Sequence, residues 1–265
     1  MHKSFLIGFG IIFASLLIGS IFLVRYAVTQ RDERNRLVAE QKVPDIKVTI
    51  IEGKRREEIA RQLDVAGVCD YDAFLAASAN LEGKLFPDTY RFFANTPAGD
   101  VVAELTKNYN NRVAKLSDTP LPKGLTSADQ ALILASIIER EAQTNAERAT
   151  ISGVYLNRLR IGMKLDADPT TQYGKDSLAL AAAEVKQDFK FWGVITRNDY
   201  VSVNSPYNTY RTVGLPPGPI ANPGIASITA AYQPEDHSYL YFFHRNGQLY
   251  PSKTLAEHEQ KLSQF

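Results

Sequence analysis

The sequence predicts an α+β protein with an N-terminal transmembrane helix, a small α/β module and a larger mixed α+β domain. Residues 5–24 form an unbroken uncharged run, close to the length of about 20 residues that a helix needs to cross a membrane. Alternating apolar residues around Val48 are followed by helical spacing, which indicates a strand and then a helix. Several later segments have helical spacing, and a hairpin turn signal, Asn246-Gly247, lies near the C-terminus.

The composition is that of an ordinary globular protein. The chain has 265 residues and a net charge of +1, which does not indicate a nucleic-acid partner. A single cysteine, Cys69, rules out an intramolecular disulfide. The sequence contains no nucleotide-binding or serine-hydrolase motif, and no metal-ligand spacing is found among its histidines: His2, His237, His244 and His258. We therefore expect no cofactor and no metal.

We interpret residues 5–24 as a single-pass anchor, with a cytoplasmic tail at 1–4 and a charged helical stalk at 25–43. A cleaved signal peptide is the alternative, but the apolar run exceeds the roughly 7–15 residues of such a core and no small-residue cleavage site ends it. Arginines follow the span, and by the positive-inside rule they favour a cytoplasmic C-terminal part. The rule weakens when a long folded domain follows.

Residues 45–80 are predicted to form a small module. Apolar residues alternate over 46–50, Glu52-Gly53 turns the chain, and helical spacing follows to about residue 65. A second short helix is expected after Asp70 or Asp72, either of which is suited to the N-cap position. A strand followed by two helices is too small to be stable alone, so the module is expected to pack against another part of the chain.

The remaining domain, 81–265, begins with an aromatic, turn-rich segment. Helical spacing returns over 98–116, and Ser127 is predicted to cap a helix that continues to about residue 142. Another helix is expected over 146–160. The chain then reads as turn-rich, with several Gly and Pro residues, until a strand near 239–247 and a final helix that starts near Thr254.

Three carboxylates lie in or just after the helix that Ser127 caps: Glu139, Glu141 and Glu147. On a wheel of 100° per residue, Leu134 and Ile138 mark the centre of the apolar stripe, and Glu141 lies on its flank. Glu139 and Glu141 are about 200° apart on this wheel, so they cannot point into the same cleft.

A carboxyl group at the end of an apolar stripe is partly desolvated, which raises its pKa and keeps it protonated near neutral pH. A general acid needs that state, which makes Glu141 a candidate. The alternative is that Glu141 only marks the polar end of a core helix. Arg140 is expected on the solvent face. Asp166 or Asp168 could supply a second carboxylate, although an Asp before Pro is more often structural.

The stretch "LASIIEREAQTNAERATISGVYLNRLRIGMKLDADPTTQYG" (134–174) resembles the core signature of the MltG (YceG-like) family of endolytic murein transglycosylases. Further similar segments follow the family order: "EGKLFPDTY" at 82–90, "ITRNDYVSVNSPYNTYRTVGLPPGPIANPG" at 195–224, and "YLYFFHRNG" followed by "TLAEH". The resemblance covers roughly residues 45–262.

This resemblance implies a catalytic domain with a helix-borne glutamate and a membrane-anchored lytic transglycosylase. Such enzymes cleave the β-1,4 bond between N-acetylmuramic acid and N-acetylglucosamine in peptidoglycan strands, leave 1,6-anhydro ends and terminate strand elongation. The family's catalytic residue is the second Glu of "SIIE-x-E", which is Glu141 here. The nucleophile is the C6 hydroxyl of the substrate, so one carboxyl group suffices where ordinary glycosidases use two.

The resemblance also implies a set of substrate-binding residues. Aromatic rings would stack on sugars, and polar side chains would bond N-acetyl and hydroxyl groups; the candidates are Tyr90, Tyr207, Tyr210, Asn157, Asp168, Thr170, Asn208 and Thr209. Each has a structural alternative as a core aromatic, a helix brace or a loop residue.

Residues 45–80 resemble the family's LysM-like subdomain, here shortened and expected to be incomplete. The expected location is the plasma (inner) membrane with the catalytic domain outside the cytoplasm. Expected partners are peptidoglycan strands, the lipid membrane and peptidoglycan synthases of the elongation machinery. A non-catalytic wall-binding scaffold and a hydrolytic muramidase are the alternative functions.

Overall fold

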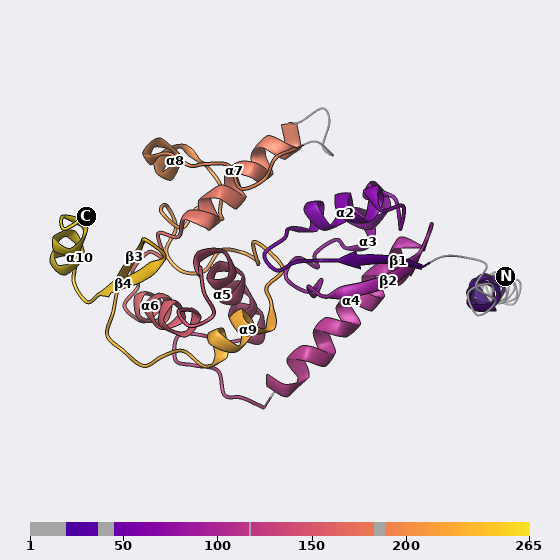
Figure 1. Cartoon of the computed structure of the whole chain (residues 1–265), viewed down its shortest axis with the longest axis horizontal. Helices are drawn as coiled ribbons and strands as arrows, with labels where there is room; N and C mark the ends of the chain where they lie inside the picture. Colours follow the sequence, from indigo (N-terminus) through magenta and orange to yellow (C-terminus); the bar gives the residue numbers. More distant parts are fainter. Residues whose placement is uncertain (1–19, 37–44, 117, 183–188) are drawn as a thin grey trace, which may run out of the picture. The chain divides into compact units, whose positions relative to one another are not determined.

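A computed structural model of the chain describes residues 20–36, 45–116, 118–182 and 189–265. The chain divides into two compact units, residues 1–46 and 47–265. The second unit contains helices and two small two-stranded sheets (Figure 1), which confirms the α+β class.

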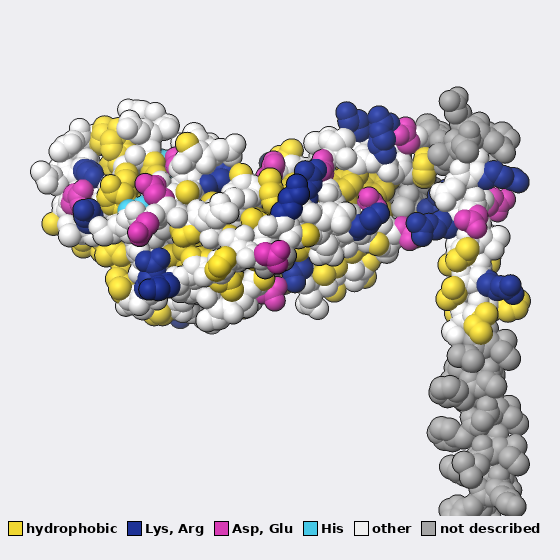
Figure 2. All heavy atoms as spheres, turned by 90° about the horizontal axis from the view of Figure 1, so that it is seen from below, with side chains coloured by type: hydrophobic (Ala, Val, Ile, Leu, Met, Phe, Trp, Pro, Cys, Tyr) yellow, Lys and Arg dark blue, Asp and Glu magenta, His cyan; other side chains and the backbone are white. Residues whose placement is uncertain are grey.

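In the first unit, residues 20–36 are helical. The apolar side chains of residues 21–24 are exposed, and charged side chains follow them (Figure 2). Within the described residues, no helix is long and apolar enough to cross a membrane. The predicted tail at 1–4 and most of the predicted span at 5–24 lie outside those residues, as does the stalk beyond residue 36.

The small module begins with strand β1 (Asp45–Thr49), which is followed by helices α2 (Arg56–Val65) and α3 (Tyr71–Ala77). Of the two N-cap candidates, Asp70 caps α3 by accepting a 2.8 Å hydrogen bond from the backbone N–H of Ala73. Strand β2 (Thr89–Phe93) pairs with β1, although it lies beyond the boundary expected at residue 80.

Helix α4 (Ala98–Val113) follows and packs against α3 and α9. The core of the second unit is built on α5 (Ala128–Glu141), which packs against α6 (Arg148–Arg160), α7 (Asp168–Ala182) and α9 (Ile225–Tyr232). All side chains from Ala131 to Ile138 are buried, so α5 is surrounded by protein over two turns.

The turn-rich reading of residues 161–238 was wrong in three places. Helices α7, α8 (Arg197–Ser202) and α9 all lie in that region. The hairpin was predicted correctly: β3 (Tyr241–Arg245) and β4 (Gln248–Ser252) are antiparallel, and Asn246 and Gly247 both have positive φ between them. The final helix, α10 (Leu255–Leu262), starts after the N-cap Thr254.

The turn after β1 is joined to the segment before α9 by backbone hydrogen bonds. The N–H of Gly53 donates to the carbonyl of Asn222, and the N–H of Asn222 donates to the carbonyl of Lys54, each at 2.9 Å. The Asn222 side chain donates to the same Lys54 carbonyl at 3.0 Å and accepts from the N–H of Leu85 at 2.9 Å. The small module therefore packs on the rest of the unit, as its size required.

Candidate active site

Helix α5 brings the candidate acid to its own C-terminal end. Ser127 caps the start of the helix by accepting a 3.2 Å hydrogen bond from the N–H of Gln130, and Glu141 is its last residue. Ala142 then has an extended backbone with ψ 130°, which ends the helix. The unpaired carbonyls at a helix C-terminus carry partial negative charge, so this position disfavours an ionised carboxylate.

Glu139 forms structural contacts. Its Oε1 accepts from Nη2 of Arg148 at 2.7 Å, with 6% of the Glu139 side chain and 13% of the Arg148 side chain exposed. Its Oε2 accepts from the N–H of Gly224 at 2.9 Å, at the N-cap of α9. Glu139 is thus bound to a cation and joins α5 to the starts of α6 and α9.

Glu147 holds the turn between α5 and α6. Its Oε1 accepts hydrogen bonds from the backbone N–H groups of Gln143 and Thr144, and its Oε2 lies 3.2 Å from Nε2 of His244 on β3. Both oxygens of its carboxylate therefore make structural contacts that stabilise this turn.

Glu141 has a different environment. Its Oε1 accepts a 2.9 Å hydrogen bond from the hydroxyl of Tyr155, a residue of α6 that is only 1% exposed. Burial raises the pKa of Glu141 to about 7; the hydrogen bond from Tyr155 opposes the rise, and the charge of Asp168 adds to it. A carboxyl group with this pKa is partly protonated at neutral pH, so it can both donate and accept a proton there.

Asp168 is exposed at the start of α7 and close enough to Glu141 for its charge to act on it. Its Oδ1 accepts a 2.6 Å hydrogen bond from the hydroxyl of Tyr210. The ring of Tyr210 stacks on that of Tyr200, with centroids 3.9 Å apart and an angle of 15° between the rings. The structure therefore brings Glu141, Tyr155, Asp168 and Tyr210 together.

Three polar residues among the expected substrate contacts are fully buried. Asn208 accepts from the hydroxyl of Thr171 and donates to the carbonyls of Tyr200 and Val203. The hydroxyls of Thr170 and Thr209 lie 2.8 Å apart. These contacts hold the 200–210 segment on α7. Substrate contact by the three residues stays a prediction, because a fully buried side chain touches no polysaccharide in this conformation.

Asn157 and Tyr90 also make internal contacts. The side-chain amide of Asn157 donates to the carbonyls of His237 and Tyr239, at 2.8 and 2.9 Å. The hydroxyl of Tyr90 donates to the carbonyl of Phe86 at 2.6 Å within the small module. Tyr207 is half-buried, with its ring centroid 4.6 Å from that of Tyr173. Sugar contact by these residues stays untested.

Arg140 does not point into solvent, which corrects the helical-wheel prediction. Its guanidinium lies 3.9 Å from the ring centroid of Trp192, a residue that no sequence pattern singled out. Trp192 has a positive φ of 63°, and its indole N–H donates to Glu58 at 2.9 Å. A helical wheel considers one helix in isolation. It therefore placed Arg140 on the solvent face, because it cannot include the distant loop that carries Trp192.

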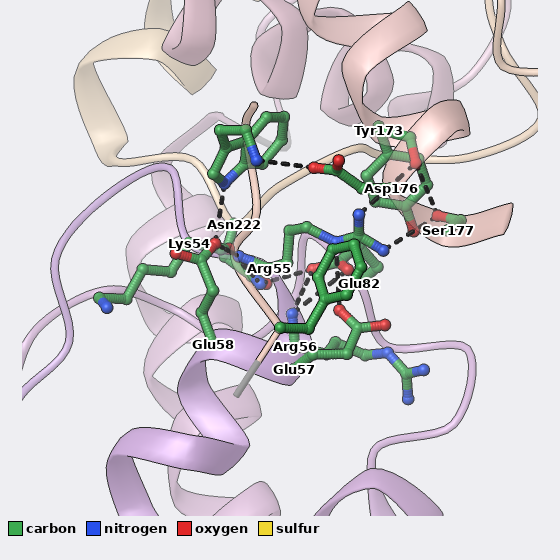
Figure 3. A network of polar contacts seen from close by, with 12 residues as sticks. Lys54, Arg55, Arg56, Glu57, Glu58, Glu82, Tyr173, Asp176, Ser177 and Asn222 are labelled. Carbon is green, nitrogen blue, oxygen red and sulfur yellow. Dashed lines mark hydrogen bonds and ion pairs between the residues drawn. The ribbon is translucent and has the colours of Figure 1, made fainter. Parts of the chain in front are cut away.

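Glu82 is another carboxyl group with a raised pKa, after Glu141. The sequence did not indicate it, although it begins one of the family-like segments. Two donors hold it: the side-chain amide of Asn222 at 2.7 Å and the N–H of Arg56 at 3.2 Å (Figure 3). Beside it, the buried guanidinium of Arg55 lies 4.0 Å from the ring centroid of Tyr173. Within the described residues, no group of three or more His, Cys, Asp or Glu side chains is placed to hold a metal ion.

The chain was compared with known proteins. A family model for the YceG-like family matches residues 21–264. The endolytic murein transglycosylase of Bacillus subtilis (strain 168) is 37% identical over 187 residues, which are 70% of this chain and 48% of that protein. The protein of that name from Streptococcus pneumoniae (strain D39) is 28% identical over 193 residues, 71% of this chain and 33% of that protein.

A 2.6 Å crystal structure of a YceG-like protein from Listeria monocytogenes is also similar. It has a TM-score of 0.66 and 32% sequence identity, and the match covers 87% of this chain and 80% of that one. The present chain spans about half the length of the Bacillus relative and a third of the length of the Streptococcus relative. The family model covers nearly the whole chain, and the chain therefore belongs to the YceG-like family.

Proposed function

We propose that the protein is a membrane-anchored endolytic lytic transglycosylase that acts on peptidoglycan. It would cleave the β-1,4 bond between N-acetylmuramic acid and N-acetylglucosamine in nascent strands, leave a 1,6-anhydro end and so terminate strand elongation. The names of the similar proteins support the activity and the substrate class.

The contrast between Glu141 and its two neighbours in the sequence carries this proposal. Glu139 is bound to Arg148, and Glu147 is bonded to backbone N–H groups and lies beside His244. Glu141 instead receives one neutral hydroxyl donor, and burial raises its pKa to about 7. A scaffold needs no carboxyl group with a raised pKa, whereas an acid that must also act as a base at neutral pH does.

The reaction needs one proton to be donated and one to be accepted. Glu141 first donates its proton to the glycosidic oxygen as the bond from that oxygen to C1 of the muramic residue breaks. The C6 hydroxyl oxygen of that residue then bonds to C1, and its proton returns to Glu141. No water is consumed. Tyr155 donates to Oε1 throughout, which leaves Oε2 to carry the transferred proton and stabilises the carboxylate between the two steps.

The anchor, the domain limits and the location are part of the proposal. Residues 5–24 would span the plasma (inner) membrane, 1–4 would remain in the cytoplasm, and 25–43 would lead to an extracytoplasmic domain at 81–265. The exposed apolar side chains of residues 21–24 and the helix over 20–36 support an anchor. Residues 45–80, with β1, α2 and α3, would be the LysM-like part, onto which β2 of the following domain pairs. Peptidoglycan synthases of the elongation machinery are proposed partners.

Product analysis tests the activity directly. Purified peptidoglycan strands are incubated with the full chain, and the products are identified by mass spectrometry. We expect 1,6-anhydro-muramic ends, and we expect none from Glu141→Gln, which has nearly the same shape but no transferable proton. Reducing ends would show a hydrolase instead, and intact strands would show a scaffold. Protease accessibility in intact cells and spheroplasts tests the location, since an extracytoplasmic domain is cut only once the wall is removed.

A further inference from the structure

A cavity of about 340 Å³ lies at the other end of α5 from Glu141. We call it the Glu82 pocket; it is lined by Asn80, Glu82, Leu132, Ile133, Tyr207 and Gly218 among others. Its size is within the range of small-ligand sites, and it combines an apolar wall with a few polar groups, which is typical of such sites. The proposed reaction does not use it.

Glu82 brings a half-buried carboxyl group to this pocket. Its Oε1 accepts from the side-chain amide of Asn222, and both of its oxygens accept from the N–H of Arg56, at 3.2 and 3.3 Å. Burial, and next the charge of Glu57, raises the pKa of Glu82 to about 8. Near neutral pH the group is therefore largely an uncharged acid, which can donate a hydrogen bond as well as accept one.

The other charged groups of the pocket neutralise each other. Lys84 and Asp129 form an ion pair with 3.0 Å between Nζ and Oδ1. The pocket therefore offers an amide, an uncharged acid and a tyrosine ring beside the apolar side chains of Leu132 and Ile133. This set suits the ring and acetamido group of an uncharged sugar better than the charged groups of a stem peptide.

The position of the pocket relates it to the cleavage site. Ile133 of the pocket and Glu141 lie on the same helix, eight residues apart, which is about 12 Å at 1.5 Å per residue. A second segment also joins the two places, because Tyr207 lines the pocket and Tyr210, three residues later, bonds Asp168 near Glu141. Because α5 is enclosed from Ala131 to Ile138, a strand that occupies both places would cross between them over the surface beside the 207–210 segment.

We infer that the Glu82 pocket binds an N-acetylated sugar ring of the same glycan strand, away from the bond that Glu141 cleaves. This inference rests on the proposed function. It assigns to the pocket a role in selecting strands long enough to reach both places.

Two substitutions alter the pocket, one by removing a polar group and one by filling space. Asn80 has a positive φ of 62°, so Asn80→Gly suits the backbone and removes only the amide. Asn95, with φ 56°, is exposed outside the pocket, and Asn95→Gly is the matched control. Gly218→Val fills the pocket: a Cβ there would lie 3.1 Å from the hydroxyl of Tyr207. Gly99→Val is its control, because a Cβ at Gly99 meets nothing within 4 Å.

The test measures binding of uncharged β-1,4-linked N-acetylglucosamine oligomers by calorimetry. All variants are made in the full chain carrying Glu141→Gln, so that cleavage cannot interfere. We expect the hexamer to bind more tightly than the dimer. Asn80→Gly and Gly218→Val should each weaken hexamer binding by about threefold to tenfold, the range of one hydrogen bond or one close contact, with a smaller change for the dimer. The control variants should bind both oligomers as the Glu141→Gln parent does.

Equal hexamer affinity in pocket and control variants would overturn the inference, and so would weakening of both oligomers to the same extent. Loss of affinity only for strands that carry stem peptides would also overturn it, and would assign the pocket to the peptide. Product analysis of the chain with Glu141 intact separates the proposed function from the inference about the pocket. Absence of anhydro ends would contradict the proposed function, and the binding data would still decide whether the pocket binds a sugar.

Discussion

The hydroxyl of Tyr155 donates a 2.9 Å hydrogen bond to Oε1 of Glu141, and this contact joins the last residue of α5 to the middle of α6. Tyr155 is nearly fully buried, and its ring lies edge-on to Phe242 with centroids 5.9 Å apart. The carboxyl group is therefore held by a donor that is itself fixed by packing, as a preorganised site requires.

Tyr155→Phe is expected to move the alkaline limb of the activity profile to higher pH. The hydrogen bond from Tyr155 lowers the pKa of Glu141, so its removal raises that pKa, and the protonated acid persists to higher pH. The rate should also fall by about threefold to tenfold, because the carboxylate formed between the steps loses one donor. Initial rates of anhydro-end formation across pH 5–9 check both effects, and an unchanged limb would contradict the assigned contact.

Asp168→Asn should shift the same limb in the opposite direction. The negative charge of Asp168 raises the pKa of Glu141, so an uncharged amide lets Glu141 ionise at lower pH. The amide oxygen can still accept from Tyr210, which keeps the local fold. The same pH series serves as the measurement. A limb that moves upward, or that moves equally in Asp166→Asn, would show that Asp168 does not act on Glu141 through its charge.

Glu139→Gln is expected to reduce stability and to leave the chemistry in place. The substitution removes the charged partner of Arg148 in a pair that is 6% and 13% exposed, and we expect a loss of about 2–4 kcal/mol in the free energy of unfolding. Thermal denaturation gives this loss, and product analysis gives any activity of the folded protein. If Glu139→Gln is stable and inactive while Glu141→Gln remains active, the two roles are exchanged.

Glu141→Gln should be more stable than the parent chain above neutral pH. The usual pKa of the side chain is 4.5 and its folded pKa is about 7, so between these values the unfolded chain has lost a proton that the folded chain keeps. Stability therefore falls as pH rises through this window, and the amide removes that fall, which is worth about 1–3 kcal/mol at pH 8. Denaturant titrations at pH 4 and pH 8 test this, and equal differences at both would contradict the raised pKa.

Asn208→Ala tests whether the buried amide braces the fold. Its side chain bonds Thr171, Tyr200, Val203 and the N–H of Tyr210 in a fully buried position. Leaving these partners unsatisfied should reduce stability by about 2–4 kcal/mol. Thermal denaturation without substrate provides the measurement. An unchanged melting temperature with weakened glycan binding would instead support the substrate-binding role of Asn208 that the family resemblance implies.

Sequence reasoning located the helix that carries Glu141 because that helix has clear signals. Ser127 is a good N-cap, the apolar residues follow at helical spacing, and the flank position of Glu141 follows from the wheel. The structural contacts of Glu139 and Glu147 could not be predicted in this way. Arg148 and Gly224 reach Glu139 from other elements, and their positions depend on tertiary packing.

Helices α7 and α9 were missed because glycine and proline were read as turn signals. Gly174 lies within α7, where a Cβ would come within 2.8 Å of Ser205, so close packing requires a glycine there. Pro169 lies in the first turn of α7, where a proline is tolerated because the first N–H groups of a helix have no partner within it. In both helices packing against neighbours outweighs weak local propensity. The sequence also gave no indication that Glu82 lies in a pocket, because its hydrogen-bond partner Asn222 is distant in the sequence.

The junction of Gly53, Lys54 and Asn222 has a consequence for how this chain tolerates variation. Its two reciprocal bonds are made by backbone atoms, so most side-chain replacements leave them in place. The glycines are the exception, because Gly53 has a φ of 78° and a Cβ at Gly224 would come within 2.6 Å of Glu52. Insertion or deletion of a single residue between positions 50 and 54 would instead break the alignment of both bonds at once. The junction therefore tolerates most substitutions but not a change in the number of residues in this turn.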